Sequence, residues 1–236
     1  MRMRDRVKVA AVVVSLGVLA VLPAGAAPPA GEGWAPLFNG KDLSGWKVPK
    51  NNNGHWKAVD NLIDYDARGG DSLWTEKSFG DFVLHIEWRL KTAKEIYGSE
   101  KDQDGKPFAY APDSGIYLRG TPKAQTNIWT NPMGSGEVWG YRTDPKMPEG
   151  IRKACTPKLR ADKPLGEWNV QEVAMKGDHL TVVLNGKTVI DTQLPGVPAN
   201  GPIALQHHGG FNPKTQRWSA ASSCIQFRDI YVKELK

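Results

Sequence analysis

Cysteine is scarce in this chain, which limits what can hold its fold together. The 236 residues include two cysteines, Cys155 and Cys224, which lie far apart in the sequence. A framework of several disulfide bridges is therefore excluded. Two alternatives stay open for this pair: a single disulfide, as an exported protein would allow, or two buried free thiols.

Clusters of basic residues are also missing. The formal net charge is +6, but residues 1–26 carry four basic residues and one acidic residue, so half of the excess lies in that segment. The rest of the chain has no dense Lys/Arg cluster and no helical basic stripe. Nucleic-acid binding depends on such a patch, so the sequence gives it little support.

No apolar run is long enough to span a membrane. The run Val9–Leu22 falls short of the ~20 residues that a spanning helix needs. It follows four basic residues at positions 2–8 and precedes a small-residue segment at 24–26, which is the layout of a secretory signal peptide. We predict that residues 1–26 are removed and that residues 27–236 form one periplasmic or secreted domain, with no stable membrane insertion. An uncleaved membrane anchor is the alternative.

Familiar catalytic motifs are absent as well. The sequence has no H-E-x-x-H zinc motif, no G-x-S-x-G nucleophile elbow and no P-loop. It also lacks the tight E-x-D-x-x-E carboxylate array of some sandwich-fold glycosidases. Residues 100–106 resemble part of a calcium loop, but Ala111 stands where the closing glutamate is required. We interpret this segment as a solvated acidic turn, and no cofactor is evident from the sequence.

What the chain does have is alternation with a period of two residues, which is typical of β-strands. In residues 82–90 one face is apolar, whereas the other carries His85, Glu87 and Arg89. Asn185-Gly186 lies between two β-branched runs and predicts a two-residue hairpin with a type I′ turn. Further strands are predicted at 114–119, 168–175, 202–206 and 224–235, the last with a bulge near Arg228-Asp229.

Short strands separated by turn residues dominate the whole mature segment. Residues 91–113 are rich in charge and turn formers, and they predict a long surface loop. No βαβ rhythm and no repeat of fixed period occurs. These patterns predict an all-β fold, a two-sheet jelly-roll sandwich.

Polar side chains on the outward faces of these strands indicate a carbohydrate site. Glu87 and Arg89 come from one strand, and Gln206 and His208 come from another. If one sheet curves, its outer face becomes a groove lined by carboxylate, imidazole, guanidinium and amide groups beside aromatic rings, which suits sugar binding. Adjacent side chains of a strand point to opposite faces, so His208 shares the face of Gln206 and His207 does not. We therefore expect His208, and not His207, in this groove. The alternative interpretation is a surface ion pair and exposed loop histidines.

The order of several segments resembles the 3-keto-disaccharide hydrolase family. The segments are "PLFNGKDLSGW", "LWTEKSFGDFVLHIEWRL", "DSGIYLRG", "GEWN", "LNGKTVID", "GPIALQHHG" and "FRDIYVKEL". The resemblance covers nearly the whole mature chain. It implies a concanavalin A-like lectin/glucanase sandwich, export, and action on an oligosaccharide or glycoside that is already oxidised at C3.

The chemistry of a 3-keto sugar suggests roles for these residues. A ketone at C3 makes the C2 proton acidic, so one base can start an elimination that water addition completes. We expect His208 to act as base or proton donor, Glu87 to share its task and Arg119 to hold the enolate oxygen. A divalent metal on Glu87 and His208 stays open. Substrate-binding roles are expected for Asp113, Gln125, Asn127, Trp129, Gln206 and Arg89. The alternative function is a non-catalytic carbohydrate-binding module on the same fold.

Overall fold

The computed structural model describes residue 29 and residues 31–236. The predicted signal peptide, residues 1–26, lies outside the described residues. Within the described part of the chain, no helix has both the length and the apolar character needed to cross a membrane.

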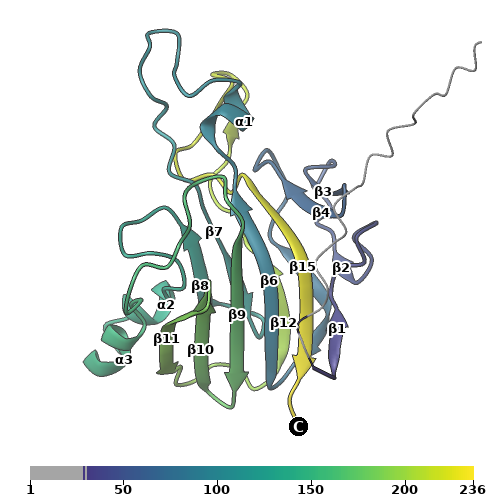
Figure 1. Ribbon diagram of the computed structural model, residues 1–236, viewed down its shortest axis with the longest axis vertical. Helices are drawn as coiled ribbons and strands as arrows, with labels where there is room; N and C mark the ends of the chain where they lie inside the picture. Colours follow the sequence, from purple (N-terminus) through teal and green to yellow (C-terminus); the bar gives the residue numbers. More distant parts are fainter. Residues whose placement is uncertain (1–28, 30) are drawn as a thin grey trace, which may run out of the picture.

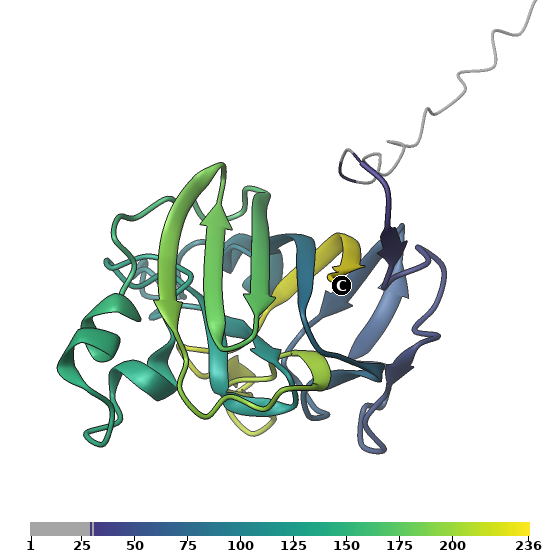
Figure 2. The ribbon, with the colours of Figure 1, turned by 90° about the horizontal axis from the view of Figure 1, so that it is seen from below.

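Two antiparallel sheets pack face to face, as Figures 1 and 2 show. The larger sheet has eight strands in the order β11-β10-β9-β6-β15-β4-β3, and β1 also pairs with β15. Their bounds are β1 Trp34–Pro36, β3 Trp56–Val59, β4 Leu62–Tyr65, β6 Phe82–Leu90, β9 Asn169–Lys176, β10 His179–Leu184, β11 Lys187–Gln193 and β15 Ile225–Glu234.

The smaller sheet has five strands in the order β2-β5-β12-β7-β8. Their bounds are β2 Trp46–Lys47, β5 Leu73–Phe79, β7 Asp113–Leu118, β8 Thr121–Trp129 and β12 Gly201–Leu205. A separate two-stranded ribbon joins β13 Phe211–Asn212 to β14 Arg217–Trp218. The predicted all-β two-sheet sandwich is confirmed.

The core fills the space between the sheets because each strand alternates apolar and polar residues. In β6, Leu84 and Ile86 are fully buried in this core, whereas His85 and Arg89 are only half-buried on the other face. In β7, Ile116 is fully buried in the same core from the opposite sheet. The outward faces of β6 and β7 therefore lie on opposite sides of the sandwich.

The predicted hairpin and bulge are both confirmed. Asn185 and Gly186 have φ values of 49° and 77° between β10 and β11, as a type I′ turn requires. In β15 the register against β6 shifts between Arg228 and Tyr231, and Asp229 has φ 49°. Between these two pairs β15 has one residue more than β6, which is what defines a β-bulge.

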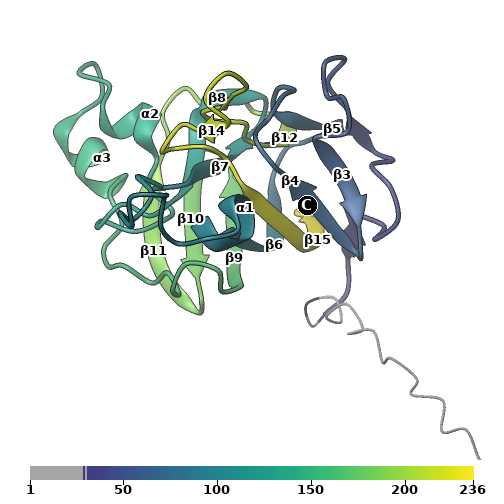
Figure 3. The same cartoon turned by 90° about the horizontal axis from the view of Figure 1, so that it is seen from above.

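Three short helices lie at the margins of the sandwich: α1 Ala93–Tyr97, α2 Trp139–Arg142 and α3 Glu149–Ala154. The prediction of a long surface loop over 91–113 is wrong for residues 93–97, which form helix α1. Thr92 and Glu95 form a capping box there, which stabilises even one turn of helix. Helix α1 packs against the β13-β14 ribbon through the rings of Tyr97 and Trp218, whose centroids lie 5.2 Å apart. Figure 3 shows the backbones of α1 and β14 from above.

Both cysteines are buried and unpaired. Cys155 and Cys224 are free thiols, which decides between the two alternatives left by the sequence. Burial raises the pKa of each thiol to about 12, so neither is a reactive nucleophile in the folded protein.

Candidate active site

The outer face of the five-stranded sheet gathers six of the residues that the sequence nominated. β7 pairs with β8 so that Asp113 lies opposite Trp129 and Gly115 lies opposite Asn127. β12 flanks β7 on its other side. Four of the six lie at alternate positions of β7 and β8, and the other two follow the end of β12. The six residues are Asp113, Gln125, Asn127, Trp129, Gln206 and His208. Opposed residues on adjacent antiparallel strands have Cα atoms only about 5 Å apart, so these side chains form one surface.

Three amide side chains of this surface are joined by hydrogen bonds. Gln125 Nε2 donates to Asn127 Oδ1 and, at 2.8 Å, to Gln206 Oε1. Asn127 in turn donates Nδ2 to a carboxylate oxygen of Glu137 at 2.8 Å. A carboxylate can only accept, so Glu137 orients all three amides in one direction. The Gln206 amide also hydrogen-bonds to the Tyr117 hydroxyl, which lowers the pKa of Tyr117 against the effect of burial.

Gly115 makes room for this network. The side chain of Gln125 lies directly over Gly115, and a Cβ added there would stand 2.4 Å from Gln125 Nε2. Glycine is therefore required at this position by close side-chain approach rather than by backbone conformation. The "DSG" segment of the sequence supplies both this space and the adjoining Asp113.

Glu137 is a functional candidate that sequence reasoning missed. Its segment folds back along the free edge of β8, with Asn127 N–H donating to the Glu137 carbonyl at 2.9 Å. The carboxylate is fully buried and forms an ion pair with Arg142 in α2. Burial raises the pKa of Glu137, although Arg142 and Asn127 oppose that effect. No periodic pattern places a loop residue in this way, so the sequence carried no signal for it.

His208 is presented to the same surface in a defined tautomer. Its Nδ1 lies 2.8 Å from the Ala221 carbonyl oxygen. A carbonyl only accepts, so Nδ1 carries the hydrogen and the lone pair of the neutral ring is on Nε2. The neighbouring His207 turns inward instead, with Nδ1 2.6 Å from the hydroxyl of the core residue Tyr65. The exposed imidazole of His208 is thus the one with an available basic nitrogen.

Asp113 lies beside His208 and is held there by Ser223. The backbone N–H of His208 donates to Ser223 Oγ at 2.7 Å, and Ser223 Oγ donates to the backbone carbonyl of Asp113 at 2.7 Å. Burial raises the pKa of the Asp113 carboxyl to about 6, His208 lowers it in part, and Glu137 adds to the rise. A carboxyl group whose pKa is raised toward neutrality, beside an imidazole with an available ring nitrogen, can serve as an acid–base pair.

Aromatic rings complete this surface. Trp74 of β5 and Tyr117 of β7 have ring centroids 5.6 Å apart, and Tyr117 faces Gln125 across the strands. The Trp129 indole N–H donates to the Gly134 carbonyl at 2.7 Å. Trp129 therefore anchors the loop after β8 and offers only its ring to a ligand.

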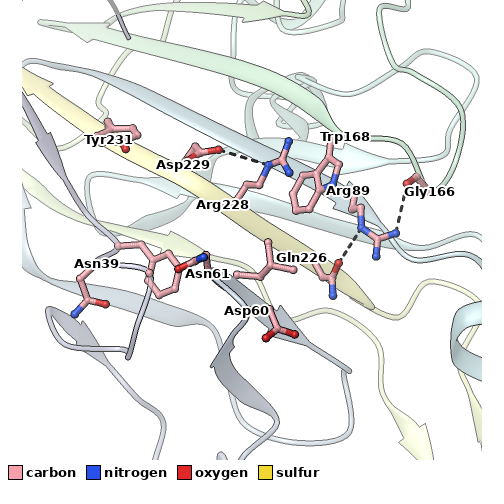
Figure 4. Close-up of a pocket in the computed structure, with 13 residues that line it drawn as sticks. Asn39, Asp60, Asn61, Arg89, Gly166, Trp168, Gln226, Arg228, Asp229 and Tyr231 are labelled. Atoms are coloured by element: carbon pink, nitrogen blue, oxygen red, sulfur yellow. Dashed lines mark hydrogen bonds and ion pairs between the residues drawn. The ribbon is translucent and has the colours of Figure 1, made fainter. Parts of the chain in front are cut away.

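The structure separates Glu87 and Arg89 from this surface. Both belong to β6 of the eight-stranded sheet, and their side chains point away from the core on its outer side. Glu87 accepts from Arg228 Nε at 2.8 Å. Arg89 donates to Gln226 Oε1 at 2.8 Å, as Figure 4 shows. The hydrophobic core lies between Glu87 and His208. The expectation that these two side chains share one groove, or one metal ion, is therefore wrong.

Arg119 also lies away from the site, because its role is structural. It follows the last residue of β7, and its side chain is 1% exposed. Its guanidinium donates to the Gly80 carbonyl at 2.8 Å and pairs with Asp81 at 2.8 Å. A buried guanidinium whose donors are occupied by the protein cannot hold an enolate oxygen.

Metal binding has no preformed site in the part of the chain that the structure describes. Across residues 29 and 31–236, no group of three or more His, Cys, Asp or Glu side chains is arranged to hold an ion. In the acidic turn, Asp102 Oδ1 accepts from the N–H groups of Asp104 and Lys106, both at 3.0 Å. That carboxylate therefore caps its own turn.

Comparisons with known proteins agree on the class of this fold. Residues 33–233 match the family described as "3-keto-alpha-glucoside-1,2-lyase-like domain". Two crystal structures from Parabacteroides distasonis ATCC 8503, each described as a "putative glycosyl hydrolase", are similar. The first has 17% identity and a TM-score of 0.56, covering 87% of this chain and 95% of its own. The second has 21% identity and a TM-score of 0.55, covering 86% and 99%. No curated protein matches.

Proposed function

Because the chain belongs to the family of 3-keto-alpha-glucoside-1,2-lyase-like domains, a carbohydrate-active family, we propose that it cleaves glycosides oxidised at C3. The observation that carries the proposal is the hydrogen bond from His208 Nδ1 to the Ala221 carbonyl, because it leaves Nε2 basic beside Asp113. Elimination followed by water addition needs one base, one acid and an oxyanion stabiliser. The outer face of the five-stranded sheet carries candidates for all three.

The first step is removal of the C2 proton by His208 Nε2. The electron pair of the C2–H bond becomes the C2=C3 bond of an enolate, and the C3 oxygen takes the negative charge. In this proposal the Gln206 amide donates to that oxygen, and the bonds through Gln125 and Asn127 to Glu137 hold the amide in place. Donors fixed before the charge develops stabilise it without reorganising during the reaction.

The second step is loss of the group at C1. The enolate electrons form a C1=C2 bond as the C1–O1 bond breaks, and Asp113 donates a proton to the departing oxygen. A carboxyl with a pKa of about 6 is protonated often enough near neutral pH to act in this way. Water then adds its hydroxyl to C1 while the Asp113 carboxylate takes the other water proton, and C2 receives a proton from His208. The net reaction is hydrolysis of the 3-keto-glycoside.

The test uses 3-keto-trehalose, with unoxidised trehalose as the matched substrate. In D₂O the 3-keto-glucose that forms from C1 should carry deuterium at C2, since the base exchanges its proton with solvent. His208→Gln should lower kcat by about 10²- to 10⁴-fold, the usual contribution of a general base. His179→Gln is the control, because His179 is an exposed side chain of β10 in the other sheet that pairs with Asp191.

Two results would contradict this mechanism. Cleavage of unoxidised trehalose, with no deuterium at C2, would indicate a conventional glycosidase. Binding of unoxidised glycan with no turnover of any 3-keto substrate would indicate a non-catalytic carbohydrate-binding module. Export is part of the proposal too, and N-terminal sequencing of the mature protein should find that it begins after residue 26.

A further inference from the structure

A cavity lies on the outer face of the eight-stranded sheet, on the side of the molecule opposite the candidate active site. Its volume is about 750 Å³. Figure 4 shows its floor, formed by outward side chains of β6 and β15, and its rim, formed by Trp168 and by turns around residues 39–40 and 60–61. The core separates it from His208, so it cannot belong to the candidate active site. Cavities of this size are typical of small-molecule and saccharide sites.

Arg228 dominates the floor of this cavity. Its guanidinium carbon stands 4.1 Å from the centroid of the Trp168 ring, and its Nε donates to Glu87 Oε2 at 2.8 Å. Stacking and the Nε bond together fix the plane of the group. No hydrogen bond among the described residues engages Nη1 or Nη2 of Arg228. The two-pronged edge of a rigid guanidinium is thus offered to a ligand.

The remaining lining mixes planar polar groups with apolar rings. Asn39, Asn61 and Gln226 bring amides, and Tyr231 and Phe38 bring rings. Gln226 is held in place, since it accepts from Arg89 Nε at 2.8 Å and donates to Asp64 at 2.7 Å. Planar bidentate groups for vicinal hydroxyls, together with rings for C–H faces, are what a sugar-binding surface requires.

The charge balance selects the class of ligand. Each arginine already has a carboxylate partner: Arg89 pairs with Glu95 at 2.7 Å, and Arg228 pairs with Glu87 at 2.8 Å. Asp229 also lies 3.5 Å from Arg228 Nε, Asp60 is a further carboxylate of the lining, and no lysine lines the cavity. An anionic ligand such as a uronate or a phosphate would meet a surplus of carboxylates and would be repelled.

We propose that this cavity is a second carbohydrate-binding site, which takes a short neutral oligosaccharide and performs no chemistry on it. The site would hold a glycan on the face of the sandwich opposite the candidate active site. It does not depend on the proposed reaction, because none of its residues takes part in that reaction.

The experiment is a binding titration on the full protein and on His208→Gln, in which turnover is expected to be much slower. The probes are cellotetraose and maltotetraose, with tetragalacturonate as the charged counterpart. Calorimetry gives the Kd, and ¹H–¹⁵N spectra report the indole resonance of Trp168. We expect at least one neutral probe to bind equally to both proteins and to shift that resonance.

The variant is Arg228→Lys, which keeps the charge but loses the two-pronged donor. It should raise the Kd for the neutral probe at least tenfold. Arg217→Lys, an exposed arginine outside this cavity, should leave the Kd unchanged. Absence of binding at millimolar concentrations, a preference for tetragalacturonate, or an unshifted Trp168 resonance would each overturn the proposal. So would an Arg228→Lys protein that stays folded and binds as tightly as the wild type.

Discussion

Replacing Gly115 by alanine perturbs the candidate active site at a single atom. The new Cβ would stand 2.4 Å from Gln125 Nε2 and 2.8 Å from Gln125 Cγ, so the Gln125 side chain has to move. Movement breaks its bonds to Asn127 and Gln206. At about 1 kcal/mol net for each hydrogen bond, we expect the free energy of unfolding to fall by about 2 kcal/mol. The Tm should fall by about 4 to 8 °C for a domain of this size.

The effect on activity should be of similar size in free energy to the effect on folding. Without Gln125, the Gln206 amide loses the partner that orients it toward the developing charge. Loss of about 1.4 to 2.7 kcal/mol of transition-state stabilisation corresponds to a tenfold to hundredfold decrease in kcat/KM. The assay is turnover of 3-keto-trehalose at a temperature well below the Tm of the variant.

Two further variants make this reasoning refutable. Gly150→Ala is the control, since no atom lies within 4 Å of the added Cβ in α3, and it should leave both Tm and kcat/KM intact or raise Tm slightly. In a Gln125→Ala background, Gly115→Ala should add almost nothing, because the clash partner is gone. Full activity of the single variant Gly115→Ala, or an equal cost in both backgrounds, would refute the argument.

Three other predictions concern buried charge and thiols. Burial raises the pKa of Asp113 from 3.8 to about 6 in the folded state, so the penalty on folding grows from pH 3.8 to about 6 and is complete above that pH. Asp113→Asn should therefore add about 2 to 3 kcal/mol at pH 7.5 by urea denaturation, and the gain should vanish below pH 3.8. An unchanged midpoint at pH 7.5 would contradict this. Arg119→Ala should cost about 2 to 4 kcal/mol, because it leaves the carbonyls of Gly80 and Gly177 without their guanidinium donor. A catalytic role for Arg119 would instead lower kcat with the Tm unchanged. A thiol reagent should label Cys155 and Cys224 only after unfolding, and failure to label the unfolded chain would reveal a disulfide.

Much of the architecture could be predicted because it rests on local rules. Alternation along residues 82–90 decided which side chains of β6 leave the core, and Asn185-Gly186 decided the turn between β10 and β11. The same alternation separates His208 from His207, whose side chains point in different directions. Each of these features depends on sterics and polarity within a few residues, and the sequence contains both.

Sequence alone determined that Glu87 and His208 point outward, and only the tertiary structure decided that they point outward on opposite sides. Which sheet a strand joins depends on long-range pairing: β6 lies against β15, and β12 lies against β5 and β7. Glu137 reached the site in the same way, through a loop that folds back on the edge of β8. Period-two alternation carries no information about partners that are distant in the chain, because every strand satisfies the same pattern whichever sheet receives it.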